Sequence, residues 1–77
     1  MVDLSTYNRS MKANSVFTIK SISGPDEVIK RLYNLGLFPS LQIQILQKIS
    51  FQSVTVIQFG ETILALNEQE IACLHGS

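Results

Sequence analysis

The clearest periodic pattern in the chain follows Pro39, where apolar and polar residues alternate. The apolar positions are Leu41, Ile43 and Ile45, and the polar positions between them are Gln42 and Gln44. A period of two is typical of a half-buried strand with one face in solvent. The alternation breaks at Leu46 and Gln47. A strand is therefore predicted to begin just after Pro39.

Other short apolar runs predict further strands. The first, within 16–22, is rich in β-branched and aromatic residues, which favour strands. A loop at 50–53 lacks the glycine of a tight hairpin, whereas Gly60 supports a turn into the next run. The predicted strands after the loop are 54–59, 63–66 and 71–74, and residues 67–70 resemble a single helical turn.

One segment has helical rather than strand spacing. Val28, Leu32 and Leu35 share one helical face, which predicts a helix over about 26–35. Its start signals are a candidate cap at Ser23 or Gly24, Pro25 in the first turn, and the acids Asp26 and Glu27. Gly36 can adopt the left-handed conformation that closes a helix, and Pro39 prevents the helix from resuming.

These elements fit a single small domain. The chain has 77 residues, and strands this short cannot form two packed sheets. A curled or closed barrel buries more of their faces. We therefore predict a mostly β fold with one short α-helix, a small β-barrel of about five strands over 11–77, preceded by a flexible arm at 1–10.

The composition favours a packed globular protein and argues against a membrane-spanning or nucleic-acid-binding one. The chain is 45% hydrophobic and 16% charged, as expected of a packed globule, and no apolar run approaches the length of a membrane span. Its N-terminus lacks the features of a secretory signal, and Cys73 has no partner for an internal disulfide, so a cytoplasmic location is expected. A formal net charge of zero argues against nucleic-acid binding. All basic residues precede residue 49, and the acids beyond it are Glu61, Glu68 and Glu70.

One phrase suggests a family. The chain resembles the FeoA family, first in the segment Arg31-Leu32-Tyr33-Asn34-Leu35-Gly36-Leu37-Phe38-Pro39. The alternating strand, the segment Leu64-Ala65-Leu66 and the ending Glu68 to Glu70 before Leu74 also match the family. These are small cytoplasmic SH3-like domains of bacterial ferrous iron uptake. The resemblance covers about 11–75. The chain departs from the family pattern at Ser40, where glycine is usual, at 49–53, which lacks the hairpin proline and glycine, and at Asn67, which replaces a common arginine.

The resemblance implies an SH3-like barrel without a cofactor that acts as an accessory protein of ferrous iron uptake. Its family partner is the membrane transporter FeoB, which has a cytosolic G domain and would recruit the chain to the inner face of the membrane. The same domain also occurs fused to metal-dependent repressors, and a chain that stands alone favours the transport role. The alternatives are an SH3-like adaptor unrelated to iron and a metal-sensing or nucleic-acid-binding small barrel.

The candidate partner surface is the helix end and the corner after it. Aromatic residues and arginine dominate interface hot spots, and this corner contains both beside a rigid turn. The candidate anchors are Arg31, Tyr33, Leu37 and Phe38, with Phe51 as an outlying candidate. Leu37 and Phe38 have an alternative assignment to the core. The face around Glu61, Glu68 and Glu70 is the next candidate surface.

The sequence gives weaker support to a metal site or a catalytic site than to a partner surface. Cys73 and His75 are two residues apart, so on a strand they share a face, and Glu68 or Glu70 would have to complete a metal site. We expect no tightly bound metal, because one His and one Cys cannot fill a closed coordination shell. His75 is the single histidine, and no residue is placed by sequence to orient it as a catalytic base, so an enzyme is not expected.

Overall fold

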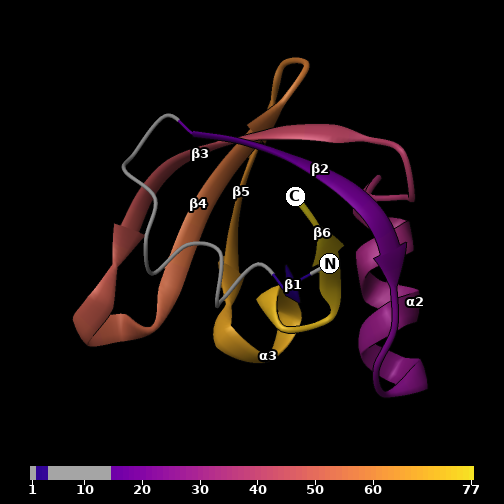
Figure 1. The fold of residues 1–77 in the computed structure, drawn as a ribbon. Helices are drawn as coiled ribbons and strands as arrows, with labels where there is room; N and C mark the ends of the chain where they lie inside the picture. The colour runs from indigo at the N-terminus through magenta and orange to yellow at the C-terminus, as the bar shows by residue number, and fades with distance from the viewer. Residues whose placement is uncertain (1, 4–14) are drawn as a thin grey trace.

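The computed structural model describes residues 2–3 and 15–77, which form one curled antiparallel sheet with short helices at its side and end (Figure 1). The order of strands in the sheet is β1-β6-β2-β3-β4-β5. Their bounds are β1 Val2–Asp3, β2 Ser15–Ile22, β3 Gln42–Ile49, β4 Val54–Phe59, β5 Thr62–Asn67 and β6 Leu74–Gly76. The predicted mostly β, barrel-like fold of about five strands is confirmed. No helix in the described part of the chain could cross a membrane.

Strand β2 bends the sheet. Its first half pairs with β3, with Ser15 opposite Ile45 and Thr18 opposite Gln42. Its second half pairs with β6, and the register shifts between Ile19 and Ser21. Because one strand serves two neighbours in succession, the sheet curls into a half-barrel around the core.

The helices are α2 Asp26–Asn34, η1 Ser50–Gln52 and α3 Glu68–Ile71. The predicted helix at 26–35 is therefore confirmed within one residue, but its predicted cap is wrong. Pro25 occupies the N-cap position and no side chain caps the helix. Ser23 instead places its Oγ 2.9 Å from His75 Nε2. The two acids of the first turn still lie at the positive end of the helix dipole.

The last strand lies later than predicted. Helix α3 extends through Ile71, so the strand predicted at 71–74 begins only at Leu74. Strand β3 continues to Ile49 because a bulge between Ile45 and Gln47 absorbs the break in alternation. Residues 2–3 of the expected arm pair with β6, and the remainder of that arm lies outside the described residues.

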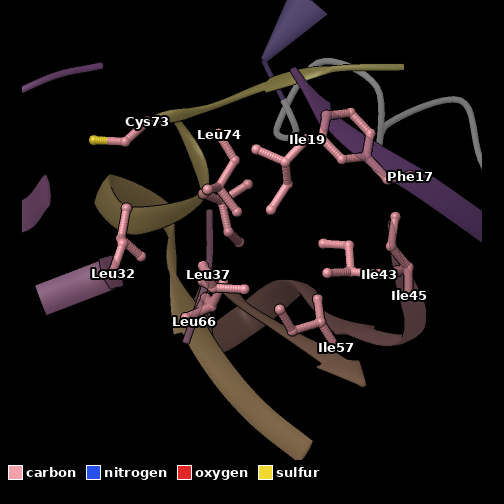
Figure 2. Packing of buried hydrophobic residues seen from close by; sticks show 11 residues of the cluster. Phe17, Ile19, Leu32, Leu37, Ile43, Ile45, Ile57, Leu66, Cys73 and Leu74 are labelled. Atoms are coloured by element: carbon pink, nitrogen blue, oxygen red, sulfur yellow. The ribbon is translucent and has the colours of Figure 1, made fainter. Parts of the chain in front are cut away.

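The core lies inside the curl of the sheet and is closed on one side by α2 (Figure 2). The helix contributes Leu32 and the corner contributes Leu37, and neither side chain is exposed. The other buried apolar residues are Phe17, Ile19, Ile43, Ile45, Ile57, Leu66, Ile71, Cys73 and Leu74. The inward alternation of Ile43 and Ile45 agrees with the sequence pattern.

Candidate partner-binding site

The corner after α2 is built from a specific helix ending. Gly36 has φ +97°, and its N–H donates to the Tyr33 carbonyl at 3.0 Å. The Leu37 N–H donates to the Leu32 carbonyl at 3.1 Å. This pair of bonds is a Schellman motif, which satisfies the last carbonyls of the helix and brings the residue after glycine against the last turn. Leu37 is thereby directed into the core.

Ser40 then ties the corner to β2. Its N–H donates to the Ile19 carbonyl at 2.6 Å, and the Ile19 N–H donates to the Leu41 carbonyl at 2.9 Å. Ser40 has φ +84°, in the left-handed region that favours glycine. Ser40 therefore holds the turn at a cost in backbone strain.

The four predicted apolar and aromatic anchors fall into three groups. Tyr33 and Phe38 are 48% and 46% exposed at the corner. Leu37 is fully buried, so its assignment as a surface anchor is wrong and its alternative assignment to the core is correct. Phe51 is 87% exposed, but it lies in η1, at the β3–β4 connection on the opposite side of the molecule from α2 (Figure 1).

Arg31 has a structural contact as well as an exposed surface. Its Nη1 donates to Glu70 Oε2 at 3.3 Å, with the arginine side chain 65% exposed and the glutamate 8% exposed. Glu70 Oε1 accepts the Asn67 N–H at 2.9 Å, and Asn67 Oδ1 accepts the Glu70 N–H at 2.8 Å. Glu70 thus joins α3 to α2, and most of the arginine side chain remains open to a partner.

This capping box at the start of α3 was missed in the sequence. Asn67 followed three residues later by Glu70 is a recognised variant of the helix-start signature, because each side chain accepts a backbone N–H of the other residue. Asn67 therefore has a structural role as the N-cap of α3. A shallow pocket of about 290 Å³ lies beside this contact, between Pro25–Val28 of the α2 start, Arg31, and Gln69–Glu70.

Comparison with known proteins identifies the family. A family model, the FeoA domain, matches residues 9–75. The chain belongs to the FeoA family. This family is associated with ferrous iron transport and consists of small SH3-like accessory domains. A comparison with curated proteins gave no match.

Solved structures show the same SH3-like fold. The crystal structure of an iron uptake regulatory protein (FeoA) has a TM-score of 0.78 at 21% identity, covering 99% of this chain and 93% of that one. The metal-dependent transcriptional regulator MtsR has a TM-score of 0.81 at 18% identity, and the manganese regulator SloR has 0.79 at 12%. This chain spans 35% and 34% of those two regulators.

The FeoA-family chain does not bring Cys73 and His75 together as a metal site. The Cys73 thiol donates to the Gln69 carbonyl at 3.4 Å, whereas His75 contacts Ser23. Burial, and to a lesser extent the negative charge of Glu70, raises the pKa of the Cys73 thiol, so it stays protonated at neutral pH. Among the residues that the structure describes, no group of three or more His, Cys, Asp or Glu is arranged to hold a metal ion.

Proposed function

We propose that this chain is a cytoplasmic accessory protein of ferrous iron uptake that binds the membrane transporter FeoB. The binding surface comprises Arg31, Tyr33 and Phe38, which we call the corner surface. The observation that carries the proposal is the partial exposure of Tyr33 and Phe38, 48% and 46%, at the end of α2 and in the turn after it, where backbone hydrogen bonds fix the chain. The family supplies the transport context.

The corner surface has the physical properties of a binding hot spot. Its aromatic rings offer large apolar areas, and its arginine offers several hydrogen-bond donors beyond the one that contacts Glu70. Because the Schellman motif and the Ser40–Ile19 bond already order the backbone, little conformational entropy is lost when a partner binds. A rigid corner therefore favours binding of a partner.

Phe51 is a second contact in this proposal. Its ring is 87% exposed, and it lies too far around the molecule to extend the corner surface as one patch. A large partner such as a transporter with a cytosolic domain is able to reach both places. A small partner would contact only one of them. Loss of affinity on substitution at both the corner surface and Phe51 would therefore indicate a large partner.

The test is binding of the full chain to FeoB purified in detergent, with Tyr33→Ala and Phe38→Ala as the main variants. We expect each variant to weaken binding by about 2 kcal/mol, roughly thirtyfold in Kd, as for a typical hot-spot aromatic. Asn34→Ala is the matched control, because it truncates an exposed side chain next to Tyr33 without removing an aromatic ring. Thermal melting of every variant separates folding from binding.

Two results would contradict the proposal in different ways. Absence of binding by the wild-type chain would reject FeoB as the partner. Wild-type affinity in folded Tyr33→Ala and Phe38→Ala variants would reject the corner surface. The acidic face around Glu61 and Glu68 would then be the next candidate, without Glu70, which is buried against Arg31 and Asn67.

A metal-sensing role is the second candidate, because metal-dependent regulators contain a domain with this fold. It is distinguished by titrating the chain with ferrous or zinc ions. We expect no binding in the micromolar range. Tight one-to-one binding that Cys73→Ser and His75→Ala abolish would favour the sensor over the transport accessory.

A further inference from the structure

The two edge strands of the sheet differ in how well they are protected from pairing with another chain. The edge strand β1 has two residues, Val2–Asp3, and short edges resist pairing with other chains. The opposite edge strand, β5, has six residues, Thr62–Asn67, without a charge, a proline or a bulge. No strand in the described part of the chain pairs with its outer side. Among the described residues, strand β5 therefore has no charge, proline, bulge or neighbouring strand that would block its outer edge.

The hairpin register identifies the backbone groups that point outward. Phe59 and Thr62 close the β4–β5 hairpin around Gly60–Glu61, with φ +58° at Gly60. The closing pair of such a two-residue hairpin exchanges both hydrogen bonds, so Thr62, Leu64 and Leu66 bond to β4. The amides of the alternate residues point away from the sheet.

Asn67 checks this assignment independently. It belongs to the outward set, and its N–H donates to Glu70 Oε1, away from β4. That contact leaves the N–H and carbonyl groups of Ile63 and Ala65 as the open part of the edge. Both side chains are exposed, that of Ile63 to 58%. Within residues 2–3 and 15–77, the edge thus combines backbone groups that no strand pairs with an uncharged, partly apolar surface.

The acidic residues at both ends of the β5 edge indicate which kind of polypeptide segment could pair with it. The edge begins after Glu61 and ends before Glu68, both exposed, and the sequence has no lysine or arginine after Lys48. An antiparallel second copy would bring acidic strand ends together, which is unfavourable. We infer that the outer edge of β5 binds an extended segment of a partner polypeptide, with basic residues at its ends, as an added strand.

Such strand addition obtains affinity from main-chain hydrogen bonds and selectivity from the flanking side chains. The partner segment would pair with Ile63 and Ala65 and place its basic ends beside Glu61 and Glu68. The inference does not depend on FeoB binding or on the corner surface, and its test contains no transporter.

The test is amide hydrogen exchange of the full chain, measured by NMR, with the synthetic peptide Lys-Val-Thr-Val-Thr-Val-Lys. In the free chain we expect the Ile63 and Ala65 amides to exchange faster than those of Leu64 and Leu66, because their N–H groups point away from β4. We expect saturating peptide to slow the first pair about tenfold or more, because binding protects an amide by mass action. The matched peptide with glutamate at both ends gives weaker protection.

Substitutions in the protein test separately the outward N–H group of residue 65 and the charges at the ends of β5. Ala65→Pro removes an outward N–H, which an edge strand tolerates, and is expected to weaken peptide binding, whereas Ala65→Ser retains the N–H and binds as the wild type does. Glu61→Gln combined with Glu68→Gln is expected to reduce the preference for the lysine peptide and its sensitivity to salt.

Three outcomes would overturn the inference. Equal exchange rates of the Ile63 and Ala65 amides with and without peptide would show that no strand is added. Slow exchange in the dilute free chain would show that the edge is already covered. Protection that increases with chain concentration in the absence of peptide would identify a second copy as the occupant.

Discussion

The corner after α2 and the β3–β4 connection both expose aromatic side chains next to a serine with positive φ, but their support differs. At the corner, Ser40 with φ +84° bonds to β2, and the neighbouring Leu37 is fully buried. At the connection, Ser53 has φ +52° and Phe51 is 87% exposed. The comparison teaches that exposure alone does not define a binding surface. An aromatic residue whose backbone is fixed by hydrogen bonds and by a buried neighbour loses less conformational entropy when it binds a partner.

The largest effect is expected where the corner joins the core. Leu32 is fully buried, and Leu32→Ala is expected to lower the free energy of unfolding by about 2 to 5 kcal/mol, through lost transfer energy and a cavity. Chemical denaturation measures this change, with Asn34→Ala on the same helix as the exposed control. An unchanged melting temperature in Leu32→Ala would show that α2 packs through another face.

The next effect concerns the contact between α2 and α3. Glu70→Ala is expected to lower the free energy of unfolding by about 1 to 3 kcal/mol, because it removes the acceptor of the Asn67 N–H and the partner of Arg31. Arg31→Ala is expected to cost less than about 1 kcal/mol, since its side chain is 65% exposed and solvent screens the pair.

The exposed Glu68 of the same helix provides the control for Glu70. Equal effects of Glu68→Ala and Glu70→Ala on denaturation would contradict a specific role for the capping box. A large loss in Arg31→Ala would show that the ion pair, rather than the cap, holds the two helices together.

The sequence predicted the elements more accurately than the site. Alternation identified the inward Ile43 and Ile45, and Gly36 marked the helix end, because both signals are local. The Arg31–Glu70 and Ser23–His75 contacts join residues that are 39 and 52 positions apart, so no local pattern reveals them. The burial of Leu37 beside the exposed Phe38 depends on the direction of the chain after the Schellman turn, which composition does not specify.

A smaller effect, of opposite sign, is expected at the two serines. Ser40→Gly is expected to raise the free energy of unfolding by about 0.5 to 1 kcal/mol, because relief of left-handed strain exceeds the entropy cost of glycine. Ser53→Gly tests the same argument at the β3–β4 connection. Thermal melting measures both, with Ser77→Gly, at the exposed C-terminus, as a control for the substitution itself. Destabilisation by Ser40→Gly would show that the serine side chain supports the turn.

The smallest effect on stability is expected at Phe51, and its contrast with Phe38 distinguishes the two aromatic sites. Phe51→Ala is expected to change the free energy of unfolding by less than about 0.5 kcal/mol, because its ring is 87% exposed and buries little area. Phe38→Ala is expected to cost about 1 kcal/mol, since roughly half of its ring area is covered. Denaturation curves of the two variants, recorded beside the wild type, measure the difference. Equal stabilities would remove the contrast between a supported and an unsupported ring, and binding of FeoB would then have to be compared at both sites without a structural preference for the corner.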